Sequence, residues 1–362
     1  NLEKQNKNMG RLMVSAIILI FLVLFPYSVN GMPQWADNQL QLRDVVKDEV
    51  YETISWQGDD GCITNLKDRI NKWKWDDEVE IFQGWIGYYY LTGDENVYNA
   101  IKKSASCYLN RMNSLGAYHG YYRDAFYDME HTTEGLMVLA NLAFARPDDD
   151  EVKGWLENIT EHLGNWVSSV EEWYNWQTHH LRSISLGTNS VASGCPKGVD
   201  WPVNLRLANM ALATYFATQN KRYYDWVKDY IDGWIESIEK NERENGIKLI
   251  PSEVDPETGE LGPCSGKWYD NEYSGFDTSW KEGGTKVVRN MVNSFISFYH
   301  MNGDEKYIDI LKDQAMLLFE HGQQNAPADK TDGSTWYACL LYTSDAADEG
   351  LGVDIGGRRI IR

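Results

Sequence analysis

Two kinds of hydrophobic pattern alternate through the middle of the chain, and together they predict paired helices. Four segments are apolar on most sides, which is typical of a helix enclosed by other helices. The segments that follow them are one-sided, with apolar side chains at helical spacing and charged side chains between them. The inner segments are 76–91, 132–144, 202–216 and 285–300, and the outer, amphipathic helices are clearest at 151–170 and 221–240.

A short phrase joins the inner helix to the outer helix, and it occurs almost unchanged at 89–98 (YYLTGDENVY) and 298–307 (FYHMNGDEKY). In the first copy Gly93 suits the left-handed residue that ends a helix. Asp94 suits the N-cap of the next helix, where its carboxylate accepts from free backbone N–H groups. The second copy repeats the pair as Gly303 and Asp304, and weaker forms lie at 142–152 and 214–224. Each copy therefore predicts the tip of an antiparallel helical hairpin.

The links from one hairpin to the next are long, at 113–131, 171–202 and 241–285. They are rich in Trp, Tyr, His, Gly and Asp. Long ordered loops on one side of a regular scaffold usually carry function. We therefore expect the functional site on the loop side of the hairpins, opposite the short tips.

The two ends of the chain differ from this pattern. Residues 1–31 combine upstream residues, a start at Met9 and a short apolar run, which predicts a secretory signal peptide and an exported protein. An uncleaved membrane anchor is the alternative, although the run is short for a spanning helix. Residues 339–362 have no helical or strand period and resemble a translated sequencing-library adapter, a real disordered tail being the alternative. The predicted domain then covers 32–338 and lacks its true C-terminal part.

The net charge of −20 excludes two classes of partner. A strongly acidic surface repels nucleic acid and anionic membranes, so we expect neither a nucleic-acid partner nor a stable membrane association after signal cleavage. Four cysteines lie in the predicted domain, and none forms a CxxC pair. No metal or other cofactor is expected, and the alternatives of one or two disulfides or of four free thiols stay open. The four are Cys62, Cys107, Cys195 and Cys264.

Inner apolar helices, outer amphipathic helices, short tips and long aromatic loops together resemble the (α/α) toroid of the six-hairpin glycosidase superfamily. The resemblance covers roughly 76–325, about four of six hairpins, and it rests on architecture and on phrases such as GDEKYID (303–309). It implies an all-α ring and a secreted enzyme that cleaves the glycosidic bonds of a poly- or oligosaccharide. In such a ring the residues that precede the inner helices converge on one cleft.

Acidic, basic and aromatic residues cluster in those convergent segments. Asp128, His131 and Glu134 are three residues apart, so they would share a face on a first helical turn. The alternative is that such acids cap the helix and favour its N-terminus electrostatically. Asp200 has the same two readings, as an N-cap or as an acid/base group. The candidate catalytic residues are Asp77, Tyr122, Asp128, His131, Glu134, His179 and Asp200.

Substrate-binding candidates are of two kinds. Arg182 and Arg206 suit a carboxylate held by two hydrogen bonds. Trp and Tyr side chains in the loops suit stacking on the faces of sugar rings, although packing of the loops is the alternative for each of them. The candidates are Trp75, His180, Arg182, Trp201, Arg206, Trp268, Tyr269 and Trp280.

Two mechanisms fit these residues, and the sequence leaves both open. Hydrolysis needs two carboxylates across the bond, from Asp77 or Glu78 and from Asp128, Glu134 or Asp200. β-Elimination from a uronate needs a base, and the candidates are Tyr122, His131 and His179 with Arg182 or Arg206 as the carboxylate partner. We expect a uronate-containing glycan as substrate. A non-catalytic exported glycan-binding protein on the same ring is the alternative function.

Overall fold

The computed structural model describes residues 34–64, 75–272, 278–282 and 284–321. The described part is mostly helical, which confirms the all-α prediction, with one small antiparallel pair of strands, β1 (Tyr174–Asn175) and β2 (His180–Leu181). The predicted signal peptide and adapter-like tail lie outside the described residues. No helix among those described is both long and apolar enough to cross a membrane.

The chain divides into two units, residues 1–52 and 53–362. The described part of the first unit is most of a single helix, α2 (Gln34–Ser55), which exposes Trp35, Leu42 and Val45. The second unit contains every other element, and the site lies within it.

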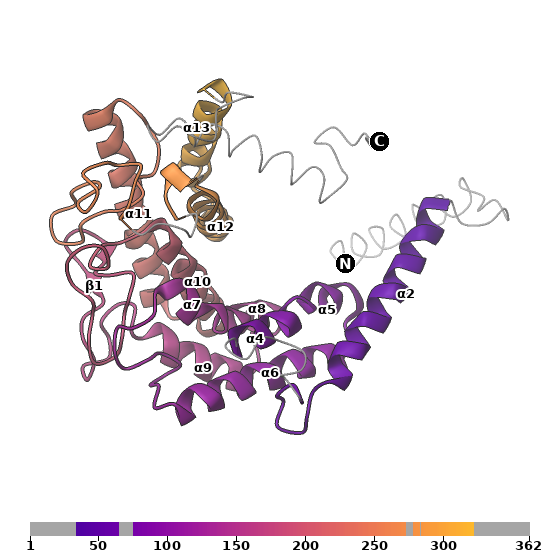
Figure 1. Cartoon of the computed structure of the whole chain (residues 1–362). Helices are drawn as coiled ribbons and strands as arrows, with labels where there is room; N and C mark the ends of the chain where they lie inside the picture. The colour runs from indigo at the N-terminus through magenta and orange to yellow at the C-terminus, as the bar shows by residue number, and fades with distance from the viewer. Residues whose placement is uncertain (1–33, 65–74, 273–277, 283, 322–362) are drawn as a thin grey trace, which may run out of the picture. The chain divides into compact units, whose positions relative to one another are not determined.

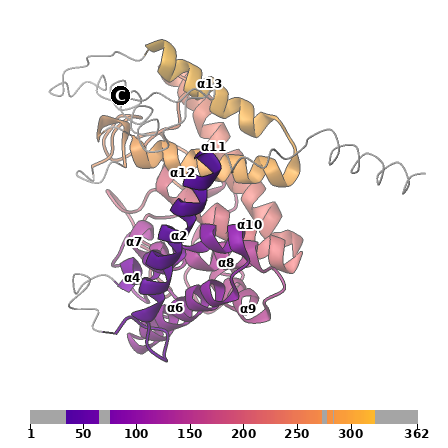
Figure 2. The same ribbon diagram turned by 90° about the vertical axis from the view of Figure 1, so that its right-hand side faces the viewer.

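Four helical hairpins make up most of the described part of the second unit, as the alternating pattern predicts (Figure 1). The partners of each hairpin contact one another, and α10 also contacts the neighbouring inner helices α8 and α12. Figure 2 shows the same helices from the side. The hairpins pair α5 (Ile86–Thr92) with α6 (Glu95–Ser114), α8 (Met137–Ala145) with α9 (Asp150–Thr160), α10 (Arg206–Thr218) with α11 (Lys221–Asn245), and α12 (Thr285–Asn302) with α13 (Lys306–His321).

The hairpin tips have the predicted local chemistry. α5 ends at Gly93, which is left-handed with φ 66°, and the Asp94 carboxylate accepts from the backbone N–H of Asn96 at 3.1 Å. At the last tip Gly303 has φ 73°, and Asp304 accepts from Lys306 N at 3.1 Å. The weaker copies work in the same way, through the N-cap side chains of Asp149 and Asn220.

Three of the inner segments are interrupted rather than continuous. The segment predicted at 76–91 is α4 (Trp75–Gln83) followed by α5, and the next is α7 (Met129–Glu134) followed by α8. The third begins as a 3-10 turn, η1 (Pro202–Leu205), before α10. At the second break a Cβ on Gly135 would lie 2.4 Å from the ring of Tyr108, so only glycine lets α7 and α8 meet against α6.

The structure confirms the predicted outer helix at 221–240 and corrects the predicted end of the one at 151–170. α11 covers the predicted 221–240, with Trp226, Tyr230 and Trp234 buried on its inner face. The helix predicted at 151–170 instead ends at Thr160. It ends there because the chain turns back at Asn165, a left-handed residue whose side-chain oxygen accepts from the N–H groups of Trp173 and Tyr174.

Two disulfides link the loops covalently to other parts of the second unit. Cys62–Cys107 joins the segment before α4 to α6, and Cys195–Cys264 joins the long loop after α9 to the loop after α11. The open question of four free thiols is thereby answered. The sequence contained no information on which cysteines pair.

Candidate functional site

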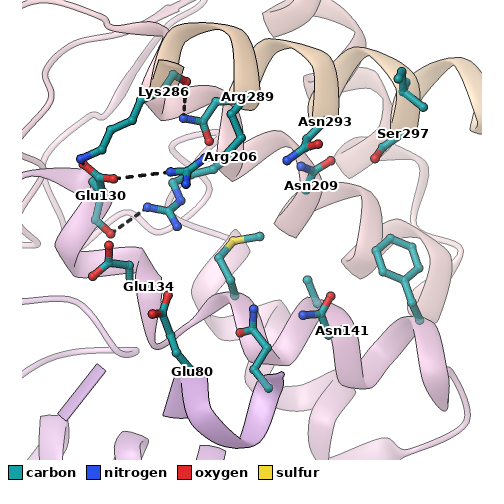
Figure 3. A pocket seen from close by; sticks show the side chains of 16 residues that line it. Glu80, Glu130, Glu134, Asn141, Arg206, Asn209, Lys286, Arg289, Asn293 and Ser297 are labelled. Atoms are coloured by element: carbon teal, nitrogen blue, oxygen red, sulfur yellow. Dashed lines mark hydrogen bonds and ion pairs between the residues drawn. The ribbon is translucent and has the colours of Figure 1, made fainter. Parts of the chain in front are cut away.

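A polar pocket of about 670 Å³ opens among the inner helices α4, α7, α8, α10 and α12. Figure 3 shows side chains from all five helices around it, with Asn141 on α8 and with Lys286, Arg289, Asn293 and Ser297 spread along α12. Three acidic and three basic side chains line it: Glu80, Glu130, Glu134, Arg206, Lys286 and Arg289.

Glu130 connects three of the helices around the pocket. Its side chain is 7 % exposed, and one carboxylate oxygen accepts from Lys286 Nζ at 2.7 Å. The other oxygen lies 3.7 Å from a guanidinium nitrogen of Arg289, and the Glu130 carbonyl accepts from Arg206 at 3.0 Å. Three cations therefore contact this one buried acid, and with Glu80 and Glu134 the pocket contains three acidic and three basic residues.

Arg206 is the least compensated of these cations. Burial lowers its pKa, and this effect outweighs the opposite influence of Glu134 and Glu130. Among the residues that the structure describes, no acceptor lies within hydrogen-bond distance of Arg206 Nε. An arginine stays protonated in proteins, so its charge is available to an anionic group in the pocket.

Amide side chains form much of the remaining wall. Asn141, Asn209 and Asn293 line the pocket, and Phe144 provides an apolar surface (Figure 3). Asn209 Oδ1 is buried without a donor among the described residues, as is Gln83 Oε1. A buried acceptor left unpaired costs about 1–3 kcal/mol.

Two of the predicted site residues, Glu134 and Arg206, line this pocket together. Arg206 lies at the start of α10. Asp77 and Trp75 belong to α4, but their side chains lie outside the described residues. Glu78 is a structural group: it is 1 % exposed, pairs with Arg111 and accepts from the N–H of Ile63.

Asp128 and His131 form a helix cap rather than part of the pocket lining. The Asp128 carboxylate accepts from the backbone N–H of His131 at 3.0 Å and contacts His131 Nδ1 at 2.8 Å. This hydrogen bond raises the pKa of His131 to about 9, in spite of partial burial. Burial acts to raise the pKa of Asp128, but its bonds to the His131 ring and N–H outweigh burial and lower it. The capping alternative therefore explains both residues.

His180 and Asp200 lie in a second, fully buried polar network. His180 Nδ1 contacts Asp200 Oδ2 at 2.9 Å, and His180 Nε2 contacts Ser237 Oγ at 3.1 Å. Asp200 also accepts from Asn204 at 2.8 Å and from the Tyr230 hydroxyl at 3.2 Å. The expected N-cap role of Asp200 is wrong, because its carboxylate is turned toward His180 instead of toward the helix N–H groups.

The other charged or hydroxyl candidates lie away from the pocket. Tyr122 stacks at a tilt on Tyr127, with 4.9 Å between ring centroids. His179 contacts the Tyr174 hydroxyl at 3.3 Å. Arg182 pairs with Glu257 and, at 3.6 Å, with Glu172.

The predicted aromatic platforms are mainly part of the core. Trp280 is fully buried and donates to the carbonyl of Ile250, and Trp201 is 2 % exposed in a cluster with Ile184 and Val199. Neither can stack on a sugar, so packing of the loops explains both. Trp268 and Tyr269 are partly exposed, contact each other edge to face, and do not line the pocket.

Among the residues that line the pocket, the sequence did not single out Glu80, Glu130, Asn209, Lys286 or Arg289. A signal was present on α12, where Lys286, Arg289, Asn293 and Ser297 recur at spacings of three and four on one face. A polar stripe of this kind on an inner, otherwise apolar helix indicates a hydrated or ligand-bearing surface.

One group of three side chains among the described residues has the spacing of a metal site: Cys62, Glu78 and Cys107. The two cysteines are joined in a disulfide, so neither offers a thiolate to an ion.

The sequence matches one protein family over residues 26–159 and again over 154–346, and the family is described as Domain of unknown function (DUF8034). No curated protein matches the chain.

Proposed function

Because the chain belongs to the DUF8034 family, whose description names no activity, we propose its function from the pocket: a secreted carbohydrate-active enzyme that hydrolyses a glycosidic bond of a uronate-containing glycan. The observation that carries the proposal is the grouping of Glu80 and Glu134 with Arg206, Lys286 and Arg289 in one polar pocket among the inner helices. The carboxylates suit acid/base chemistry at the bond, and the cations suit the carboxylate of a uronate.

The proposed architecture is an (α/α) toroid, of which the four hairpins form a part. Successive inner helices contact one another, from α4 through α8 and α10 to α12. The pocket is lined from these inner helices, and the loops run from each outer helix to the next inner one. This order supports a ring with a central cleft.

In the proposed reaction Glu80 and Glu134 act as the acid and base. Figure 3 places both carboxylates at the end of the pocket where the cations surround Glu130. Arg206 would hold the sugar carboxylate with its uncommitted Nε–H, and the Asn209 carbonyl would accept from a sugar hydroxyl. Lys286 and Arg289 pair with Glu130, so we assign Glu130 the role of positioning these cations rather than of transferring a proton.

Hydrolysis is preferred to β-elimination because of what the pocket contains. Elimination needs a neutral base such as Tyr or His close to the sugar C5 proton. No Tyr or His of the described chain lines the pocket, and the expected bases Tyr122, His131 and His179 have other surroundings. The pocket instead contains the carboxylates of Glu80, Glu130 and Glu134.

Export is part of the proposal and has independent support in the disulfides. Cys62–Cys107 and Cys195–Cys264 are two bridges in one domain. Disulfides form and persist in oxidising compartments outside the cytosol. They agree with the signal peptide expected over residues 1–31.

The test is turnover of a panel of glycans by the full chain, with polygalacturonate and glucuronoxylan as acidic probes and galactomannan as the neutral one. Mass spectrometry of the products separates hydrolysis, which adds one water across the cut, from elimination, which leaves one end short of a water. Glu134→Gln and Glu80→Gln should each lower kcat by about 10²–10⁴, the usual contribution of one acid/base group.

Glu236→Gln provides the matched control, since Glu236 is exposed on the outer helix α11 and should leave turnover unchanged. Elimination products would overturn the hydrolytic mechanism. Glycan binding without any turnover would overturn the enzyme and support the glycan-binding alternative.

A further inference from the structure

A second polar surface lies on the outer helices, with none of its lining residues shared with the pocket. A hollow of about 610 Å³ and a smaller one of about 150 Å³ adjoin α6 and α9, and Trp155 of α9 lines both. The larger hollow also includes Ile54 and Gln57 at the end of α2, within the second unit. We call the two hollows together the outer groove.

The α6 wall of the outer groove is a regular polar stripe. Its residues recur at spacings of three, four, three, four and three, which places them on one face of a helix. The stripe runs from Asn96 to Asn113, which is 17 steps along the helix or about 25 Å at the rise of an α-helix. The opposite face of α6 is buried, so the stripe is the outward face. It consists of Asn96, Asn99, Lys103, Ser106, Asn110 and Asn113.

The chemistry of this stripe differs from that of an ordinary solvated helix face. Four of its six members are asparagines, each of which offers two donors and an acceptor without charge. Lys102, the other cation of the groove, is already compensated by Asp149 at 2.8 Å and Glu151 at 2.9 Å. A ligand with many hydroxyls in a row matches such a surface better than an anion or a cation does.

Trp155 adds an apolar surface at the middle of the groove. The side chain is half-buried, and it lies between the two hollows, with Asn158 of α9 beside the smaller one. An indole combines a flat apolar body with one N–H donor, so it suits the C–H face of a sugar ring whose hydroxyls reach the flanking amides.

We propose that the outer groove is a second binding site for an extended, hydroxyl-rich glycan chain, independent of the pocket. The proposal concerns binding and requires no cleavage. An oligosaccharide would lie along α6 with one ring against Trp155 and its hydroxyls on the asparagines. Such a site would hold a polymer on the outside of the hairpins while another part of it is free to reach the pocket.

The test is affinity electrophoresis of the full chain in native gels that contain glucuronoxylan, polygalacturonate or galactomannan. The Glu134→Gln background prevents cleavage during the run. In a gel whose glycan retards the original protein, Trp155→Ala should weaken the affinity for that glycan about tenfold, as expected for the loss of one well-packed aromatic contact. The double variant with Asn99→Ala and Asn110→Ala should also weaken retardation, and it should not disturb the core because both side chains are exposed.

Two controls separate the groove from other causes. Trp176→Ala removes a tryptophan that is 44 % exposed between β1 and β2 and does not line the groove, so it should leave retardation unchanged. Arg206→Ala disables the pocket and should also leave most of the retardation. The proposal is wrong if no glycan retards the protein, or if retardation is lost in Arg206→Ala and kept in both groove variants. Failure of the turnover assay alone would contradict the pocket's function and not the groove.

Discussion

The pocket and the His180–Asp200 network both contain acidic and basic side chains, but the two places differ in how completely these side chains are hydrogen-bonded. In the network, Asp200 is fully buried and accepts from His180, Asn204, Tyr230 and the backbone of Leu181, so its carboxylate is saturated by the protein itself. Burial raises the pKa of Tyr230 well above its ordinary value, which keeps this donor protonated. The network has the contacts of a structural element.

In the pocket the hydrogen bonding is incomplete. Glu130 is compensated by Lys286 and Arg289, but Arg206 Nε and Asn209 Oδ1 lack partners among the described residues. The comparison teaches that residue type does not separate a structural acid or base from a functional one. What differs is the carboxylate itself: Asp200 accepts from four donors and has no capacity left for a ligand, although Asn204 Oδ1 beside it is unpaired like Asn209 Oδ1 of the pocket.

Removing the centre of the network should have the largest effect. Asp200→Ala removes the shared acceptor of a buried histidine, an amide, a phenol and a backbone N–H, and we expect a loss of about 3–5 kcal/mol in the free energy of unfolding. Urea denaturation followed by circular dichroism measures it. Asp124→Ala, at an exposed aspartate, should stay within about 0.5 kcal/mol of the original protein. A loss from Asp200→Ala no larger than that would mean that the network is not structural.

Removing the unsaturated cation of the pocket should affect function more than stability. Arg206→Ala should lower kcat/KM for the acidic glycan about tenfold to a hundredfold, since hydrogen bonds to charged groups contribute about 1.5–3 kcal/mol. The free energy of unfolding should change by only about 1 kcal/mol. Arg243→Ala, at an exposed arginine of α11, is the control for both measurements. Equal loss of activity on a neutral glycan would argue against a carboxylate contact.

The cap of α7 gives the smallest expected effect and a pH dependence of known sign. The pKa of His131 is raised to about 9 from 6.5, so its pair with Asp128 stabilises the fold fully below about pH 6.5. This contribution is lost as the pH rises toward 9. Because the His131 side chain is 41 % exposed, solvent screening reduces the effect to about 1 kcal/mol.

The measurement is the urea midpoint at pH 6 and at pH 9. His131→Gln should remove the part of the difference that comes from the pair, and the variant's two midpoints should lie closer together. An unchanged difference would show that other groups produce it. Turnover at a fixed pH is not expected to require His131, in contrast with Glu134.

Local features of the fold were readable from the sequence, whereas the site was readable only in part. Asp94 caps a helix two residues away, so the signal and its partner lie within one short phrase. Arg206 followed from its place near the start of an inner helix. By contrast, Glu130 and Lys286 are 156 residues apart, and no spacing rule joins them.

The predictions for Asp200 and for the loop tryptophans were wrong for a related reason, because they too depend on contacts between distant parts of the chain. Asp200 stands where an N-cap would, but its carboxylate has a stronger set of donors in His180 and Tyr230, which come from other parts of the chain. The tryptophans of the loops were expected at the surface of a cleft. Trp201 and Trp280 are covered by neighbouring loop segments, and coverage depends on tertiary packing that composition does not reveal.

The disulfide between Cys195 and Cys264 has a consequence for a protein exposed to digestion. The bridge encloses 69 residues of sequence, including α10, α11 and much of two long loops. A protease that cuts once within this stretch produces two polypeptides that stay covalently joined. The nicked molecule keeps its inner helices together through the bridge as well as through packing, so a single cleavage in a loop need not separate the two pieces.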